Sequence, residues 1–273
     1  MLRICAALTL PLAASYSHAS DGCAHAADRS ARLDTQGVRS IVITAGAGDL
    51  KIRGSDTNAL TAKGRACASN EELLSGIQLD TRREGDTLHL TARTPETDGN
   101  LLTLSRYARI NLDVSLPNSI AIEVNDGSGD TEIANVASAR VTDGSGDLEI
   151  ENVSGDLNVT DSSGDLEIEQ VDGNVTVRDS SGVLEIEHVR GAVLIEVDSS
   201  GDIHIADVGS VHIRNDSSGD IVAQRVKGDV TIDNDSSGDI RVEDVAGNFT
   251  VGADGTGSIR HERVGGRVQI PQR

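Results

Sequence analysis

Carboxylates at regular intervals are the residues of this chain that could do chemistry. In the second half of the sequence, glutamates recur every 17 or 18 residues in two series. The first series is Glu132, Glu149, Glu167 and Glu185, and the second is Glu151, Glu169 and Glu187. Carboxylates gathered on one surface attract divalent cations or basic proteins, and a pair of them can supply the acid and base of glycoside hydrolysis. The glutamate series therefore suggest cation binding, binding of a basic protein, or glycoside hydrolysis.

Aspartates recur with a similar spacing, in the sequence Asp-Ser-Ser-Gly-Asp. Calcium-binding nonapeptide rolls also carry periodic glycine and aspartate, but at both corners of each coil. Here the second corner has few acids, and Val183 replaces the aspartate that should follow Asp179. Because Asp and Ser also form turns without a metal, a calcium site and a purely structural corner both stay open. The candidate calcium ligands are Asp143, Asp147, Asp161, Asp165, Asp198, Asp202, Asp216, Asp220, Asp235 and Asp239.

The repeat that carries these acids predicts a β-solenoid. Its first glycines are Gly129, Gly146, Gly164, Gly182, Gly201, Gly219, Gly238 and Gly257, in steps of 17 to 19 residues. Each coil has two halves in which apolar and polar residues alternate, so each half is one short strand. In the coil that begins at Gly164, we expect Leu166 and Ile168 to face inward. We expect Gly164 and Gly173 to supply unusual backbone angles at the two corners.

Stacking turns each repeated position into a column. Parallel strands lie about 4.8 Å apart, so eight coils form a rod about 40 Å long, and the two glutamate series become an acidic face. Without the leader, Tyr107 and Phe249 are the only aromatic residues, so the core must consist of Val, Ile and Leu. The fold class is therefore all-β, a single-stranded parallel β-solenoid with two short strands per coil. Residues 257–273 form its terminal coil and cap, rich in cations.

The N-terminal part follows the repeat less regularly. We expect residues 20–118 to form an irregular β portion and cap, and residues 119–273 to form the regular solenoid. Residues 69–74 match a capping box and predict one short helix. Cys23 and Cys67 are the only cysteines after residue 19 and predict a disulfide that closes a loop of about 44 residues, which would contribute about 3–4 kcal/mol.

Residues 1–19 have the layout of a secretory signal peptide. Arg3 precedes an apolar run from Ile4 to Ala14, and Ser17-His18-Ala19 fits a cleavage site. We therefore expect an exported protein, periplasmic or at the cell surface and outside it, with no membrane span. The formal net charge is −20, which opposes binding to nucleic acid and favours basic partners.

The chain resembles the bacterial putative-adhesin families of unknown function, including the autotransporter-adhesin head type. In these families an apolar strand ending in Leu-Pro leads into Gly-Ser-Gly-Asp coils. Here these elements are residues 110–117, ending in Leu116-Pro117, and Gly127-Ser128-Gly129-Asp130, and the likeness covers roughly residues 37–270. The resemblance implies a cell-envelope β-solenoid without known catalysis, and it transfers no active-site residues.

The sequence supports a binding or structural module better than an enzyme. It contains no nucleophile elbow, phosphate loop or zinc signature, and the regular coils carry no Trp or Tyr platform for a sugar ring. We therefore predict no catalytic residues and no cofactor other than the possible calcium. The glutamate face is the predicted interface, with a basic envelope or surface protein as partner. A calcium-binding secreted β-roll and a carbohydrate-active β-helix enzyme are the alternatives.

Overall fold

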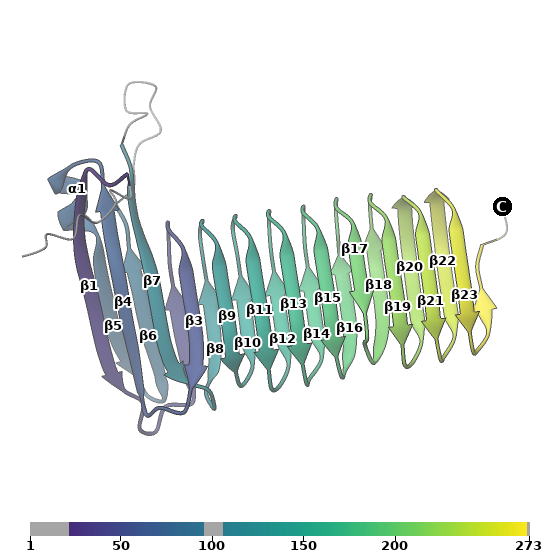
Figure 1. Ribbon diagram of the computed structural model, residues 1–273, viewed down its shortest axis with the longest axis horizontal. Coiled ribbons are helices and arrows are strands. Elements are labelled where there is room, and N and C mark those ends of the chain that lie inside the picture. Colours follow the sequence, from purple (N-terminus) through teal and green to yellow (C-terminus); the bar gives the residue numbers. More distant parts are fainter. Residues whose placement is uncertain (1–21, 96–105, 272–273) are drawn as a thin grey trace, which may run out of the picture.

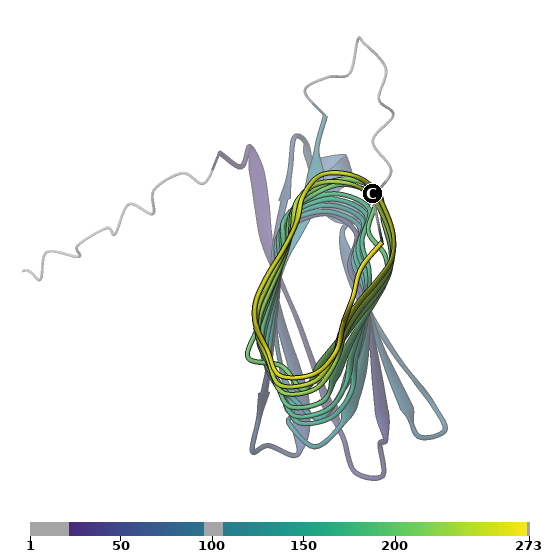
Figure 2. The same cartoon turned by 90° about the vertical axis from the view of Figure 1, so that its right-hand side faces the viewer.

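The protein is a rod built from two long β-sheets (Figure 1). The computed structural model describes residues 22–95 and 106–271, so the predicted signal peptide lies outside the described residues. Each sheet has 12 strands. Viewed along the rod, the coils superimpose as a flattened oval whose two long sides are the sheets (Figure 2).

Each regular coil contributes one strand to each sheet, and neighbouring coils pair in parallel. The first sheet contains β9 (Thr131–Val136), β11 (Leu148–Val153), β13 (Leu166–Val171), β15 (Leu184–Val189), β17 (Ile203–Ala206), β19 (Ile221–Val226), β21 (Ile240–Val245) and β23 (Ile259–Val264). The second contains β10 (Ala139–Thr142), β12 (Leu157–Thr160), β14 (Val175–Arg178), β16 (Ala192–Val197), β18 (Ser210–Asp216), β20 (Val230–Ser237), β22 (Phe249–Thr256) and β24 (Val268–Gln269). Leu148 pairs with Leu166, which pairs with Leu184. This architecture confirms the predicted parallel β-solenoid.

The core is a set of aliphatic columns between the two sheets. Leu166 and Ile168 on β13, and Val175 and Val177 on β14, are buried as the alternation predicts. Phe249 is the one aromatic side chain of the described core, and it lies near the C-terminal end of the rod on β22. Identical or similar residues therefore stack on one another from coil to coil.

The first corner of each coil depends on its glycine, as predicted. Gly164 has a φ of +132°, and the other seven repeat glycines have φ between +120° and +147°. These angles are open to glycine and strained for residues with a Cβ. A Cβ built on Gly164 would also overlap the carbonyl oxygen of Gly146 in the preceding coil. The glycine therefore supplies both the turn and the space for close stacking.

The second corner turns at a different residue from the one predicted. Gly173 does not have a positive φ, whereas Gln170, three residues earlier, has a φ of +59°. The same left-handed position is held in other coils by Asn135, Asn152, His188, Asp207, Arg225, Asp244 and Arg263. Gly173 is required for space, because a Cβ there would overlap the backbone of Gly155. The only sign of this corner in the sequence is a break in the alternation, where the polar residues Glu169 and Gln170 follow one another before the buried Val171.

The N-terminal part widens the rod and closes one end. The antiparallel strands β1 (His25–Asp34), β4 (Ala59–Ala68) and β7 (Ala108–Pro117) extend the first sheet, and the hairpin of β5 (Gln78–Glu84) and β6 (Thr87–Arg93) extends the second. Helix α1 (Glu71–Gly76) confirms the predicted short helix, and Asn70 is its N-cap, accepting a hydrogen bond from the Leu73 amide at 2.8 Å.

The solenoid itself begins within this part. Strands β2 (Ser40–Thr44) and β3 (Leu50–Ser55) form a coil that stacks in parallel on β8 (Ala121–Asn125) and β9. On their other side β2 and β3 pair in parallel with β6 and β7 of the cap, and the chain continues into the regular coils at β8. The degraded repeat around residues 48–52 is therefore a structural coil.

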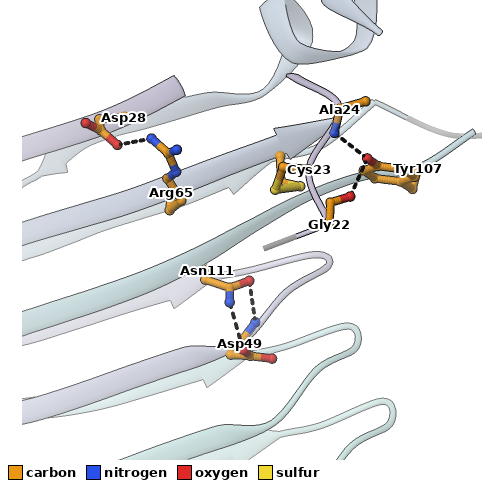
Figure 3. The surroundings of a disulfide bond; sticks show 9 residues. Gly22, Cys23, Ala24, Asp28, Asp49, Arg65, Tyr107 and Asn111 are labelled. Carbon is orange, nitrogen blue, oxygen red and sulfur yellow. Dashed lines mark hydrogen bonds and ion pairs between the residues drawn. A yellow bond between two sulfur atoms is a disulfide. The ribbon is translucent and has the colours of Figure 1, made fainter. Parts of the chain in front are cut away.

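The disulfide between Cys23 and Cys67 is present and fastens the start of β1 to β4 (Figure 3). The Tyr107 hydroxyl reinforces this end: it accepts a hydrogen bond from the Ala24 amide at 2.8 Å and donates one to the Gly22 carbonyl at 3.1 Å. The first described residues are thus tied down by one covalent bond and two hydrogen bonds.

We expect Gly164→Ala to destabilise the protein by about 3 kcal/mol or more, because it combines a forbidden backbone angle with overlap against Gly146. Gly85→Ala is the matched control: its φ is +62° but a Cβ there meets no atom within 4 Å. The control should cost only about 1 kcal/mol. Urea unfolding of the two variants measures the difference. Equal stability losses would contradict a role for the glycine column in close stacking.

Candidate interaction face

The predicted glutamates do come together on one face of the rod. Strand register pairs Glu132 with Glu149, Glu149 with Glu167, and Glu167 with Glu185. The second series pairs in the same way, from Glu151 to Glu169 to Glu187, on the same strands. Because residues two apart on a strand point to the same side, these seven side chains form two adjacent columns on β9, β11, β13 and β15. We call these seven residues the Glu face.

The two edges of the Glu face contact basic groups of the same chain. Glu132 forms ion pairs with Lys51 and Arg53 of β3. At the other edge, His188 Nδ1 lies 3.7 Å from a Glu169 oxygen and 3.8 Å from a Glu187 oxygen. The face is thus bounded on both sides.

Its centre has no such partner. In the described chain, no ion pair involves Glu149, Glu151, Glu167 or Glu185. Burial, followed by repulsion from Glu149 and Glu185, raises the pKa of Glu167. Like charges held at the spacing of β-strands oppose one another, so a cation placed over the centre would lower the energy of the face.

The outer aspartate column has a structural role. The Asp147 carboxylate accepts a hydrogen bond from the Asp165 amide of the next coil at 3.1 Å, and the Asp165 carboxylate accepts one from the Val183 amide at 2.9 Å. Asp202, Asp220 and Asp239 make the same bond to the coil that follows them. Val183 interrupts this ladder, because its side chain has no acceptor for the Asp202 amide.

The inner aspartate column is buried. Asp143, Asp161, Asp198, Asp216 and Asp235, together with Asp126 and Asp179, are between 1% and 7% exposed. The candidate calcium ligands therefore divide into one set inside the corner and one set outside it. In residues 22–95 and 106–271, no group of three or more His, Cys, Asp or Glu side chains is placed to hold a metal ion, so the calcium site stays a prediction.

A polar groove that the sequence did not lead us to expect lies beside the Glu face. It has a volume of about 600 Å³ and follows the second corner across successive coils. Its walls carry left-handed residues together with Asn118 and turn residues. The left-handed residues are Asn135, Asn152, Gln170, His188 and Asp207, and the turn residues are Ser154, Asp172, Arg190 and Lys227. In the sequence, the groove is marked by a polar residue of varying type that directly precedes the valine of the second corner, as Gln170 precedes Val171.

Beyond the groove, the same left-handed column becomes an ion-pair ladder. Arg225 pairs with Asp207 at 2.8 Å, and Arg263 pairs with Asp244 and with Glu243. The hydrogen bond from Arg225 lowers the pKa of Asp207. These acids of the C-terminal coils are therefore paired within the chain, whereas Glu149, Glu151, Glu167 and Glu185 of the Glu face form no ion pair among the described residues.

The Glu face offers little room for a substrate. The hollow beside Glu149 and Glu151 has a volume of about 40 Å³, far below the several hundred Å³ of ordinary ligand pockets. The face is a shallow charged surface, suited to contact with another surface. Among the described residues, no helix has the length and apolar character needed to span a membrane.

The fold and these columns define a repetitive β-solenoid with an acidic side, and comparison with known proteins gives its family. The profile of the Toastrack DUF4097 family matches residues 38–250. The chain therefore belongs to the Toastrack DUF4097 family, in agreement with the resemblance to adhesin-like proteins of unknown function. No curated protein matches the sequence.

Several solved structures are similar to this chain at low sequence identity. A "putative lipid binding protein" from Parabacteroides distasonis is 19% identical, with a TM-score of 0.49, over 90% of this chain and 97% of its own. A "putative adhesin" from Parabacteroides merdae is 10% identical, with a TM-score of 0.41, over 91% and 97%. A "putative cell adhesion protein" from Clostridium sporogenes is 12% identical, with a TM-score of 0.32, over 90% and 100%. None of these likenesses carries a conclusion about the ligand of this chain.

We expect Val183→Asn to stabilise the protein by about 0.5–1.5 kcal/mol relative to Val183→Ala. The asparagine oxygen can accept the Asp202 amide, as Asn174 accepts the Ala192 amide at 2.9 Å in the other corner. Val183 is 40% exposed, so neither substitution opens a cavity. Urea unfolding of both variants checks the prediction. Equal stability would mean that the side-chain ladder adds nothing to the backbone pairing.

Proposed function

We propose that this protein is an exported, non-catalytic binding or structural module of the cell envelope, which contacts a basic protein surface through its Glu face. In this proposal the N-terminal portion, residues 20–118, closes one end of the rod, and residues 119–273 present the face. The partner is an envelope or surface protein with exposed Lys or Arg.

One observation carries the proposal: the four central glutamates form no ion pair within the described chain, although ion-paired acids surround them. Glu132 has Lys51 and Arg53, and Asp207 has Arg225. The chain thus neutralises acids elsewhere and leaves this patch open. The flat, rigid sheet beneath it would let several charges meet a partner together, which makes a set of exposed pairs stronger than one isolated pair.

Export is supported by the leader-like residues 1–19 and by a disulfide, a bond that persists in oxidising compartments. We expect the mature protein recovered from the envelope or the medium to begin at Ser20, after cleavage behind Ala19. Intact mass and N-terminal sequencing of the exported product check this. A full-length product retained inside the cell, beginning at Met1, would rule out export by this leader.

We expect the triple variant Glu149→Gln, Glu167→Gln and Glu185→Gln to weaken binding to a labelled octalysine peptide by about tenfold or more at about 150 mM salt. Lysine over this face relieves the repulsion among the three carboxylates, and the neutral amides remove that gain. Fluorescence anisotropy measures the affinity, and thermal unfolding confirms that the variant remains folded.

The matched control removes three charges elsewhere: Asp56→Asn, Glu72→Gln and Glu123→Gln. These exposed acids form no ion pair within the residues that the structure describes, and none belongs to the Glu face. The control should bind octalysine nearly as well as the native chain. If both triple variants weaken binding equally, only net charge matters and the Glu face is not the interface.

A further inference from the structure

The interior of the first corner holds a column of carboxyl groups that the proposed interface does not use. Asp143, Asp161, Asp179, Asp198 and Asp216 occupy the same position in successive coils and are each 1% or 2% exposed. Asp126 and Asp235 continue the column in both directions. We call these seven residues the Asp column. A buried carboxylate without a partner is costly, so seven in a row need an explanation.

Backbone amides satisfy only part of the column. The Ser162 amide donates to Asp161 Oδ1 at 2.8 Å, and the Ser180 amide donates to Asp179 Oδ1 at 2.7 Å. The second oxygens, Asp161 Oδ2 and Asp179 Oδ2, have no donor. Neither oxygen of Asp143, Asp198 or Asp216 has a donor in good hydrogen-bonding geometry, although nearby backbone amides still act on Asp198 and Asp216.

The charged groups that act on the column are other carboxylates. Its members lie within hydrogen-bonding reach of one another, as Asp143 does with both Asp126 and Asp161. Asp49 adds to the repulsion at the N-terminal end of the column, and Asp254 does so at the other end. In the described part of the chain, no Lys, Arg or His forms an ion pair with the seven members. Thr131 contributes only a hydroxyl, 3.4 Å from Asp126 Oδ2.

We propose that the Asp column binds protons at neutral pH, with Asp143, Asp179 and Asp216 protonated and donating hydrogen bonds to the ionised aspartates stacked beside them. Protonating alternate members gives three of the ionised carboxylates a donor and separates the remaining negative charges by two coils. The stability of the solenoid then depends on protons bound by the Asp column, and therefore on the surrounding pH.

The electrostatics of the column agree with this alternation. Burial, followed by repulsion from neighbouring aspartates, raises the pKa of Asp143, Asp179 and Asp216 to about 7. Burial also raises the pKa of Asp161 and Asp235, but hydrogen bonds from backbone amides and from the neighbouring aspartates oppose the rise. Asp198, between two proposed donors, has a pKa of about 6 for the same reasons.

These shifts determine the direction of the pH dependence. Between pH 3.8 and about 7 the folded chain binds protons that the unfolded chain has released. Stability must therefore fall as pH rises through this window, and the proton-dependent contribution is lost above it. This is the reverse of ordinary acid unfolding.

The test compares thermal unfolding between pH 5 and pH 8.5 for two triple variants of the full mature chain. Asp143→Asn, Asp179→Asn and Asp216→Asn imitates the protonated column, because each amide can donate to its neighbours at any pH. Asp147→Asn, Asp165→Asn and Asp202→Asn is the control, since it removes three charges from the outer column and keeps an acceptor oxygen. We expect the native Tm to fall by about 5 °C or more across this range. The inner variant should lose most of that fall, and the control should keep it.

An infrared spectrum gives a readout independent of stability. The native protein at pH 6 should show the C=O stretch of protonated carboxyl groups, and the inner variant should lack most of that band. If the inner triple variant does not fold, Asp179→Asn alone should reduce the band by about one third, since it removes one of the three proposed donors.

Two results would overturn the proposal. One is a native spectrum without protonated carboxyl groups at pH 6. The other is a Tm at pH 8 that rises with millimolar calcium in the native chain and in the outer control but not in the inner variant, which would make the column a cation site.

Discussion

Close stacking of nearly identical coils is the constraint on which the rest of the structure depends. Parallel strands in register place each side chain directly beside its counterpart in the next coil, at about 4.8 Å. The repeat glycines permit this distance at the corners, because a Cβ on Gly164 would overlap the carbonyl oxygen of Gly146. Once the backbones are this close, the residue at each position lies directly beside the equivalent residue of the next coil. Apolar residues then give a buried core that is aliphatic except for Phe249 in the residues described, and amide and serine positions give hydrogen-bonded ladders such as Ser181 Oγ to the Ser162 carbonyl at 3.3 Å.

The same constraint brings equivalent acidic residues close together, and the chain offsets their repulsion in more than one way. Outside the corner, each aspartate accepts a backbone amide from the next coil, as Asp165 does from Val183. In the C-terminal coils, acids alternate with arginines along the left-handed column, as in the pair of Asp207 and Arg225. The central glutamates and the inner aspartates neither accept an amide from the next coil in this way nor pair with arginines. The glutamates are open to a partner that brings positive charge, whereas the buried aspartates are accessible only to something as small as a proton or an ion.

Much of this architecture could be predicted from residue types and spacing. Alternation assigned Leu166 and Ile168 to the core and Glu167 to the surface, and the glycine steps placed the first corner of all eight coils. Spacing could not show which residue turns the second corner. Gln170 and Gly173 are both compatible with a turn, and only the backbone reveals that the first is left-handed while the second provides space. The polar groove follows from that corner, so it was missed as well.

Burial of the inner aspartates was the harder feature to foresee. Asp161 and Asp165 belong to one Asp-Ser-Ser-Gly-Asp corner, yet Asp161 is 2% exposed and Asp165 is exposed. The chain turns its first corner between them, at Gly164 with its φ of +132°. Because the inner positions must fit the same small corner in every coil, they have little freedom to vary. The outward columns carry glutamate, histidine, valine and arginine in turn, from Glu185 to His204 to Val222 to Arg241. In the proposed function, recognition therefore resides in the outward columns, while the proposed protonation of the inner column sets the conditions under which the rod remains intact.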